Sequence, residues 1–563
     1  MVKKAIALMT KEIGGLHEIA YLLAFFTFLS QILAILRDRI LAGSFGTGPL
    51  LDVYYASFKI PDTIFVSLAS LVSASIIIPF IIEKENLSKD DVKKFLSSIF
   101  TVFFFLLFLC SLIIFFLTPN IVSFLFPDFF LDQRGVHAIL FTKVMLLQPI
   151  FLGLSNFVSG ILQSKGRFFV YALSPLLYNL GIIIGIIFLY PRLGDWGLAW
   201  GIVLGAVLHF LVQLPALFTI GLVPKITTKI NFAEVFRVFR LSLPRTIALS
   251  ANNLSTIVLI SIASSIGFGA IAVFNFGWNL QSVPLAIVGA SYSMAAFPTL
   301  SRLFKDKNEL KFLELLRSSI NHIIFWSMPF LTLFIVLRAQ IVRVVLGSGN
   351  FDWNDTRLTA ATLAIFSVSI VAQGVSILLT RAYYARGKTY IPLFTNVSSA
   401  ILIPVFVFLF LKIFEHSLFV ESFLGSLLRI SDLEGIKMIT LPLGYTLGTL
   451  LNVFVLWFLF KKEIPCWDKN VISNTVHSFC SSVFGAFVTY LALNLFDNFF
   501  NLDKTFGVFA QGFLSGLLGL FTMIIFLKLL RSSILEETIQ SLKRIFHKKP
   551  TTISSDFVEG QSL

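Results

Sequence analysis

The chain has 563 residues, of which 56% are hydrophobic and 13% charged, and its mean hydropathy is +0.88. A soluble globular domain carries about 25% charged and about 45–50% apolar residues, so this composition excludes a water-soluble enzyme, a disordered chain and a disulfide scaffold. It indicates an integral membrane protein. The net charge of +14 is typical of basic cytoplasmic loops in such a protein, and we expect no nucleic-acid partner.

Fourteen apolar segments are long enough to cross a bilayer, because a hydrocarbon core about 30 Å thick needs about 20 helical residues. Helices are expected since lipid leaves the open edge of a sheet without hydrogen-bond partners. In chain order, the predicted spans are 19–36, 55–82, 95–117, 138–160, 168–190, 196–222, 241–265, 271–299, 313–337, 358–380, 390–412, 438–460, 471–495 and 506–528.

The basic residues of the loops predict the orientation of the chain. With the N-terminus in the cytoplasm, that side holds 30 of the 44 Lys and Arg residues and the other side 11, when residues at span ends are counted in the adjoining loop. The remaining three, Lys59, Lys143 and Arg245, lie within spans. Because positively charged loops stay in the cytoplasm, we predict that both termini are cytoplasmic.

Two short matches recur along the chain at nearly the same interval. Phe45-Gly46 and Phe268-Gly269 each precede a proline by fifteen residues, counted from the glycine, and lie 223 residues apart. Lys165-Gly166-Arg167 and Arg386-Gly387-Lys388 lie in short basic turns 221 residues apart. Chance explains either match alone. Together they favour a duplication of six spans in one orientation, with a site at the interface of the two copies.

The predicted architecture is all-α, with two six-helix lobes around a central cavity and two extra helices. The predicted segments are 1–223 (N-terminal lobe, spans 1–6), 224–435 (C-terminal lobe, spans 7–11), 436–465 (span 12, completing that lobe), 466–530 (spans 13–14) and 531–563 (cytoplasmic tail).

Charged residues cluster where the first predicted span ends and the second begins. They are Arg37, Asp38, Arg39, Asp52, Lys59 and Asp62. Ionisable groups inside a membrane are costly and usually face a cavity, so we predict that these residues line the central cavity and bind an anionic head group. The alternative is that Arg–Asp pairs and side chains reaching the membrane surface only stabilise the lobe.

Three further residues are candidates for the same cavity. Arg245 follows Pro244 in span 7, Asn279 lies in span 8, and Lys143 stands alone in span 4. The alternatives are an anchor at the membrane surface for Arg245 and an interhelical hydrogen bond for Asn279. The histidines have no metal-ligand spacing and no catalytic constellation is evident, so we expect a protein that is not an enzyme and has no metal and no cofactor.

These motifs resemble a known family. Arg37-Asp38-Arg39, Phe45-Gly46-x-Gly48, Asp52 and Phe58-Lys59-Ile60-Pro61-Asp62 resemble the first two spans of the MurJ (MviN) family, the bacterial lipid II flippases. Pro244-Arg245-Thr246-Ile247 and the run from Asn279 to Ser301 resemble its seventh and eighth spans. The family belongs to the multidrug/oligosaccharidyl-lipid/polysaccharide exporter superfamily.

The resemblance implies a flippase of the bacterial inner membrane that moves undecaprenyl-diphosphate-linked muropeptide to the outer leaflet by alternating access. A cationic cavity would receive the diphosphate and sugar head, and a groove of spans 13–14 the lipid tail. The expected partners are this lipid-linked substrate, the bilayer and, as a candidate coupling ion, a monovalent ion. A monomer is expected.

The chain departs from the family at several cationic positions, which are occupied here by Gln31, Phe65, Val66 and Asn279. The candidate substitutes are Lys59, Lys143, Arg39 and Arg245. The departures leave two alternatives open. One is a flippase or exporter of another lipid-linked oligosaccharide or of a multidrug substrate. The other is a scaffold for cell-wall enzymes that transports nothing.

Overall fold

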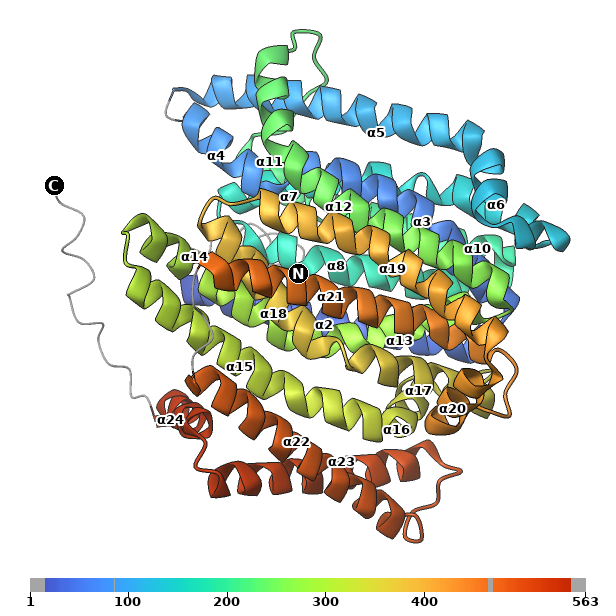
Figure 1. The fold of residues 1–563 in the computed structure, drawn as a ribbon. Helices are drawn as coiled ribbons and strands as arrows, with labels where there is room; N and C mark the ends of the chain where they lie inside the picture. Colours follow the sequence, from blue (N-terminus) through green and yellow to red (C-terminus); the bar gives the residue numbers. More distant parts are fainter. Residues whose placement is uncertain (1–15, 86, 464–468, 548–563) are drawn as a thin grey trace.

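The structure is a computed structural model that describes residues 16–85, 87–463 and 469–547. These residues form helices and connecting turns, with no strand among them. The long helices run roughly parallel to one another in a layered bundle (Figure 1). A helix satisfies its own backbone hydrogen bonds, which is the arrangement that a chain of this composition needs in lipid.

In the first half of the chain, the initial helix α2 is followed by a series of long helices, several of which are interrupted by short breaks. The elements are α2 (Leu16–Phe45), α3 (Pro49–Ala69), η1 (Ser70–Val72), α4 (Ala74–Glu85), α5 (Lys89–Leu125), η2 (Pro127–Leu131), α6 (Arg134–Met145), α7 (Gln148–Ser164), α8 (Phe168–Ile184), η3 (Gly185–Leu189), α9 (Tyr190–Leu193), α10 (Trp196–Leu211) and α11 (Leu214–Ile220).

The second half repeats this pattern and adds a helical hairpin. Its elements are α12 (Phe232–Ile266), α13 (Ala270–Pro284), η4 (Leu285–Ala290), α14 (Ser291–Lys305), α15 (Glu309–Val336), α16 (Arg338–Leu346), α17 (Trp353–Ser367), α18 (Ile370–Ala385), α19 (Tyr390–His416), α20 (Leu418–Leu428), η5 (Ile436–Ile439), α21 (Thr440–Glu463), α22 (Lys469–Phe496), α23 (Thr505–Leu529) and α24 (Ser533–His547). The hairpin of α22 and α23 lies along one edge of the bundle, against α15 and α16 (Figure 1).

Among the described residues, 12 helices are long and apolar enough to cross a membrane, or up to 13 if the bent pair α17–α18 is one span. The first predicted span, 19–36, lies within α2, which is not among these helices. The helical membrane architecture is therefore confirmed, and the count of fourteen stays a prediction.

Several predicted spans are broken rather than continuous. The second, 55–82, is interrupted after α3, because Ser73 has extended backbone (φ −64°, ψ 151°) before α4 begins. The tenth, 358–380, consists of α17 and α18, which meet at Val368-Ser369 with a bend of 45°. A run of apolar residues reports burial in lipid but not where the backbone bends, which is why the sequence did not predict these breaks.

The structure shows further correspondences between the two halves. The helix pair α6–α7 is interrupted at Leu146-Leu147, and α17–α18 at Val368-Ser369, at an interval that matches the repeated motifs. All four repeated glycines have positive φ: Gly46 61°, Gly269 81°, Gly166 70° and Gly387 72°. These correspondences favour the duplication, and the boundaries of the two lobes stay a prediction.

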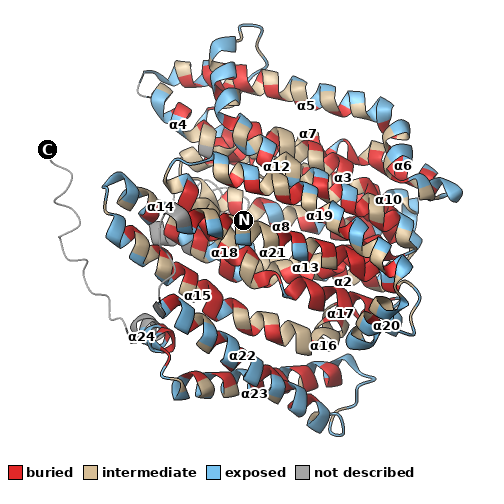
Figure 2. Ribbon diagram, in the orientation of Figure 1, coloured by how far each residue is buried: buried red, intermediate tan, exposed pale blue. Residues whose placement is uncertain are grey.

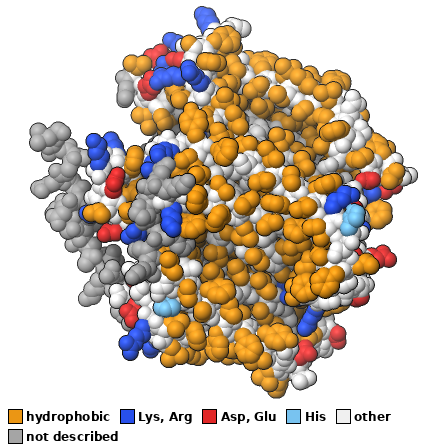
Figure 3. Space-filling view, in the orientation of Figure 1, with side chains coloured by type: hydrophobic (Ala, Val, Ile, Leu, Met, Phe, Trp, Pro, Cys, Tyr) orange, Lys and Arg blue, Asp and Glu red, His pale blue; other side chains and the backbone are white. Residues whose placement is uncertain are grey.

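Polar and apolar side chains are segregated along the bundle. Hydrophobic side chains cover its middle, and charged ones gather at the two ends (Figure 3). Buried residues concentrate on the inner helices, whereas outer helices such as α5 expose apolar side chains, including Phe116 (71%) and Phe124 (84%) (Figure 2). We call the end with loops 164–168, 223–231, 305–309 and 385–390 the basic end, and the end with loops 45–49, 125–134, 266–270 and 346–353 the opposite end.

Candidate functional site

Two residues of the predicted charged cluster, Arg37 and Asp38, form a hydrogen-bonded network among three helices. Arg37 Nε and Nη2 both donate to Asp38 Oδ1, at 3.0 and 2.8 Å. Arg37 Nη1 donates to Asn179 Oδ1 on α8 at 3.0 Å, and Asn279 Nδ2 on α13 donates to Asp38 Oδ2 at 2.9 Å. These four residues, the central network, link α8 through α2 to α13.

The central network carries no net charge. Asp38 is only 5% exposed and lies beside the guanidinium that balances it. A buried charge without a partner is strongly destabilising, so this pairing explains how both groups are accommodated between helices. Tyr54 and Tyr55 of α3 lie within electrostatic range of the pair. Asp38 engages Arg37 Nε and Nη2, so an anionic ligand that binds both of these nitrogens must displace the carboxylate.

A cavity of about 70 Å³ adjoins the central network. Its lining comes from α2, α13 and α16 and consists of Gln31, Ala34, Ile35, Arg37, Asp38, Phe276, Asn279, Leu280, Ser282, Val283, Val345 and Leu346. A cavity of this size accommodates a few water molecules. In this conformation the space beside Arg37 does not hold a sugar-diphosphate head.

Asp52 binds the N-terminus of a helix from the other half of the chain. Its Oδ2 accepts from the backbone N–H of Gly269 at 2.6 Å and its Oδ1 from that of Ala272 at 2.9 Å. The side chain is 1% exposed. Because the N-terminus of a helix carries partial positive charge and unpaired N–H groups, the carboxylate stabilises α13 there. Asp52 is thus a link between α3 and α13 and does not line the cavity beside Arg37.

Arg39 binds the C-terminus of α16. Its Nη1 donates to the carbonyl oxygens of Val344 (2.5 Å) and Val345 (3.1 Å). The last carbonyls of a helix have no partner within the helix and favour a cation, which is the role that the guanidinium fulfils. Arg39 therefore holds α2 against α16 and is not placed in the cavity beside Arg37.

The end of α2 and the turn after it contact the loop before α17 and the first turn of α17. Asn350 N donates to Gly43 O at 2.8 Å, and Thr47 N donates to Asp355 Oδ2 at 3.3 Å. Thr47 Oγ1 donates to the same carboxylate. We call these contacts, together with those of Asp52 and Arg39, the opposite-end gate, since they join the two halves of the chain at the opposite end.

Lys59 and Arg245 do not line the cavity beside Arg37. Lys59 is partly buried on α3 and lies within electrostatic range of Asp62, one helical turn further on. Arg245 is exposed on α12, and its Nη1 donates to Ser73 Oγ at 3.3 Å. Within the part of the chain that the structure describes, the predicted cations are therefore not gathered in one cavity in this conformation.

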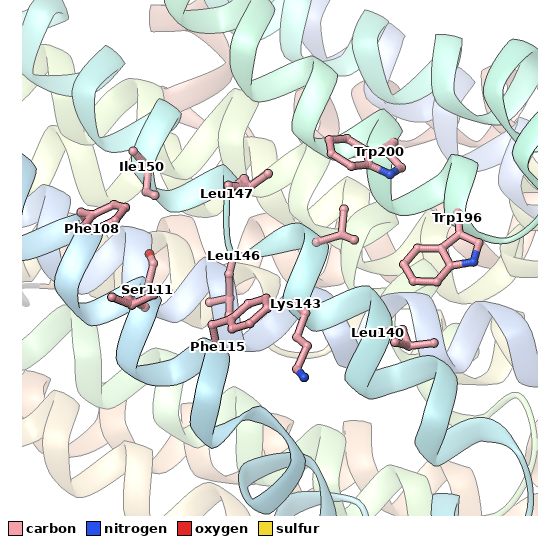
Figure 4. A pocket seen from close by; sticks show the side chains of 12 residues that line it. Phe108, Ser111, Phe115, Leu140, Lys143, Leu146, Leu147, Ile150, Trp196 and Trp200 are labelled. Atoms are coloured by element: carbon pink, nitrogen blue, oxygen red, sulfur yellow. The ribbon is translucent and has the colours of Figure 1, made fainter.

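Lys143 lies in a different place from the other candidates. It lines a pocket of about 430 Å³ on the outer side of the bundle, between α5, α6 and α10 (Figure 4). Its Nζ lies 5.0 Å from the centre of the Phe115 ring. Lys143 is thus separate from the central network.

Sequence reasoning missed two residues that the structure makes prominent. Asn179 is 7% exposed and accepts from Arg37, and Asp355 is held by Thr47 at the opposite-end gate. The signal for Asn179 was an amide inside an apolar span, four residues after Pro175, to whose carbonyl it donates at 3.2 Å. Asp355 could be recognised only as a capping residue of α17, which it is; its contact with Thr47 depends on packing between distant segments.

The central network brings together a guanidinium, a carboxylate and amides. Groups of this kind can recognise a charged, hydrogen-bonding partner. Among the described residues, no group of three or more His, Cys, Asp or Glu side chains could hold a metal ion.

Comparison with known proteins identifies relatives over most of the chain. The family model described as lipid II flippase MurJ matches residues 41–510. A probable lipid II flippase MurJ from Thermotoga maritima is 26% identical over 520 residues, covering 91% of this chain and 96% of the relative. One from Buchnera aphidicola is 25% identical over 484 residues, covering 83% and 94%. The lipid II flippase MurJ of Burkholderia cenocepacia is 26% identical over 403 residues, covering 70% and 78%.

Solved structures share the fold. A lipid II flippase MurJ in an inward closed conformation aligns with a TM-score of 0.72 and 21% identity, covering 90% of this chain and 98% of that one. An inward-facing multidrug resistance MATE family transporter of the MOP superfamily aligns with a TM-score of 0.62 and 17% identity, covering 77% and 94%. With the family model matched from residue 41 to residue 510 and the bundle shared with these transporters, the chain belongs to the lipid II flippase MurJ family.

Proposed function

We propose that the protein moves lipid II, the undecaprenyl-diphosphate-linked muropeptide, from the inner to the outer leaflet of the bacterial inner membrane. The observation that carries this proposal is the match to the lipid II flippase family over residues 41–510. The physical need is that a diphosphate joined to a sugar-peptide head crosses lipid only if its charges are shielded. A polar network enclosed by apolar helices supports such a task.

Arg37 is the residue that we propose to bind the diphosphate. A guanidinium binds two phosphate oxygens at once, which favours Arg37 over a point charge. In the structure its Nε and Nη2 donate to Asp38, so the diphosphate exchanges with that carboxylate. Asp38 is also held by Asn279 on α13. Movement of α13 away from α2 releases Asp38 and makes Arg37 available, which couples binding to separation of the lobes.

The opposite-end gate supports alternating access between lobes 1–223 and 224–465. We place the basic end and both termini in the cytoplasm, so the gate closes the outer side while the substrate enters from the inner side. Release to the outer leaflet then requires the contacts of Asp52, Arg39 and Thr47 to break. A membrane potential acts on cations that move with a lobe, at about 2.3 kcal/mol per elementary charge per 100 mV, so it is a candidate driving force, as is a monovalent ion gradient.

Spans 13 and 14, within 466–530, are the proposed binding place of the lipid tail. Two pockets of about 300 and 240 Å³ lie between α16 and α23. The second of these is lined almost entirely by apolar side chains, among them Ile341, Val344 and Phe509. An apolar groove beside the central helices suits a polyprenyl chain, and we propose that a monomer provides it.

One alternative cargo is favoured by a specific observation. The transporter of the MATE family shares the fold, and cations of the flippase family are replaced here by residues such as Gln31, which lines the cavity beside Arg37. A related exporter of another lipid-linked oligosaccharide or of a multidrug substrate would fit these facts. If the protein were a non-transporting scaffold, replacing Arg37 would leave its function intact.

The test is replacement of a lipid II flippase in bacteria depleted of their own. We expect the wild-type chain to restore lipid II to the outer leaflet, measured by its accessibility to an externally added lipid II-cleaving enzyme. Arg37→Ala should abolish the rescue, whereas Arg302→Ala, at an exposed position on α14, should leave it intact. Well-expressed wild-type protein that restores no lipid II would refute the cargo, and equal rescue by both variants would remove Arg37 from transport.

A further inference from the structure

The pocket that contains Lys143 is a second candidate binding site, on another face of the molecule. It has a volume of about 430 Å³ and lies among α5, α6, the start of α7 and α10 (Figure 4). Its lining comprises Phe108, Ser111, Leu112, Phe115, Leu140, Lys143, Val144, Leu146, Leu147, Ile150, Trp196 and Trp200. The helices α5 and α6 lie on the side of the bundle away from the hairpin of α22 and α23 (Figure 1). The pocket is therefore distinct from the proposed tail groove.

Lys143 supplies the charge of this pocket. Its Nζ lies over the Phe115 ring at 5.0 Å, and no carboxylate lies within ion-pair distance among the residues that the structure describes. Every other lining side chain except Ser111 is apolar or aromatic. A lysine within a membrane span is costly unless an anion or water meets it, and a ring face compensates only part of that cost. The position therefore favours an anionic ligand.

Ser111 supplies an independent polar group. It is 5% exposed, it lines the pocket, and its hydroxyl has no hydrogen-bond partner among the described residues. Two threonines on the same helix instead bond to the carbonyl four residues before them, Thr101 to Ser97 at 2.7 Å and Thr118 to Ile114 at 2.6 Å. A buried hydroxyl without a partner is destabilising, so a ligand in this pocket that accepts a hydrogen bond from Ser111 would be favoured.

Two partly exposed tryptophans line one side of the pocket. Trp196 and Trp200, each 42% exposed, line it at the start of α10. His137 of α6 and Asp195 before α10 are 3.4 Å apart, so α6 and α10 begin at the same end of the bundle. Tryptophans are enriched at the membrane surface, which favours a position of this side of the pocket near the level of the lipid head groups.

We propose that this pocket binds one anionic phospholipid, with its phosphate on Lys143 and its acyl chain among the apolar side chains. The volume falls in the range of ligand pockets, about 300–1,000 Å³. A long apolar chain matches the lining, a single anionic group matches the single cation, and Ser111 donates to a carbonyl oxygen of the lipid ester. The inference does not depend on which cargo the protein transports.

The test measures lipids retained by the full-length protein. Purified protein is equilibrated in nanodiscs that contain phosphatidylcholine and phosphatidylglycerol in equal parts, then released, and its bound lipids are counted by native mass spectrometry. We expect wild type to retain one phosphatidylglycerol in preference to phosphatidylcholine. Lys143→Gln should weaken this retention about ten-fold, the effect of losing one charged hydrogen bond.

Two variants make the result specific. Lys412→Gln is the matched control, since Lys412 also lies over a ring, that of Phe408 at 5.7 Å, but is paired with Glu415 and lines none of the pockets described above; it should retain the lipid as wild type does. Ser111→Phe fills the pocket from another helix and should also abolish retention, while its melting temperature reports whether it folds. Equal retention of both lipids, or no change in Lys143→Gln, overturns the site. Displacement of the bound lipid by undecaprenyl phosphate at equal concentration overturns the assignment to a phospholipid.

Discussion

Arg37 and Asp38 show why the identity of a charged residue does not state its role. Both were predicted to meet an anionic head group, yet in this conformation each is satisfied by the other and by the amides of Asn179 and Asn279. Neighbouring residues in a helix seldom face each other, and here the long guanidinium returns to its neighbour's carboxylate. The Arg37–Asp38 pair therefore has a structural role as well as a proposed binding role, because a ligand that binds Arg37 Nε and Nη2 together must displace Asp38.

Asp52 provides the residue-level prediction. We expect Asp52→Asn to lower the stability of the closed form by roughly 1–3 kcal/mol, because an amide cannot accept from two N–H groups as a carboxylate does, and the buried N–H of Gly269 or Ala272 is left unpaired. The measurement is the thermal unfolding midpoint of the purified protein in detergent. Asp90→Asn, in the exposed first turn of α5, is the matched control and should shift the midpoint much less. Equal shifts would show that the contact of Asp52 with α13 stabilises the protein no more than an exposed carboxylate at a helix N-terminus does.

Among the elements, α13 is held by its N-terminus. Gly269 has φ 81°, and a Cβ there would lie 2.3 Å from the carbonyl oxygen of Thr47. Glycine is therefore required at this position for two reasons. The backbone is left-handed, and the turn that follows α2 leaves no room for a Cβ atom. The long helix α12 has a different role, since it packs along both α3 and α19 and so contacts both halves of the chain.

Gly269→Ala is the prediction for this element. A left-handed conformation costs an alanine about 1–2 kcal/mol, and the contact with Thr47 adds to it. Gly221→Ala isolates the first effect, because Gly221 has φ 69° with nothing within 4 Å of its Cβ position. We expect the melting temperature of Gly269→Ala to fall below that of Gly221→Ala, and Thr47→Cys to become more reactive toward a soluble maleimide in the Gly269→Ala background. If the two alanine variants have the same melting temperature, the close approach of Thr47 to Gly269 does not contribute to stability.

The whole molecule combines a closed opposite-end gate with polar contacts near the middle of α12. There the hydroxyls of Ser67 on α3 and Ser250 lie 2.8 Å apart, and those of Ser70 on η1 and Thr246 lie 2.6 Å apart. The gate contacts instead join α2 and α3 to α13, α16 and α17. A transporter that alternates between two open forms must exchange such sets of contacts, and hydrogen bonds to backbone groups can be remade with water when the gate opens.

Locking the gate should stop transport. Thr47→Cys with Asp355→Cys, in a chain whose three native cysteines are replaced by serine, places two thiols where the wild-type side chains are hydrogen bonded. We expect a short thiol crosslinker to abolish rescue of flippase-depleted cells and a reductant to restore it where the crosslinker is cleavable. Asn396→Cys with Asn452→Cys, whose amides are 3.4 Å apart on α19 and α21, is the control within one predicted lobe and should tolerate crosslinking. Continued transport with the gate crosslinked would contradict alternating access through it.

By itself, the sequence determined the class of the molecule and most of its helices. Hydrophobicity over about 20 residues is a local property, so apolar runs predict helices in lipid without reference to the rest of the chain. The repeated glycines were likewise detectable in the sequence, and the structure shows that Gly46 and Gly269 both adopt the positive φ that glycine permits. The motifs around Arg37 and Asp52 were sufficient to predict the family that the match over residues 41–510 then confirmed.

Only the tertiary structure decided what each charged residue does. Asp52 contacts Gly269, Arg39 contacts Val344, and Lys143 lies in an outer pocket, and each of these depends on how distant helices pack. An ionisable residue in an apolar span indicates that a partner is needed. Which residue is the partner depends on how segments hundreds of residues apart pack together. The physical reason is that desolvation is a property of the residue, whereas the hydrogen bond or opposite charge that offsets it is a property of the fold.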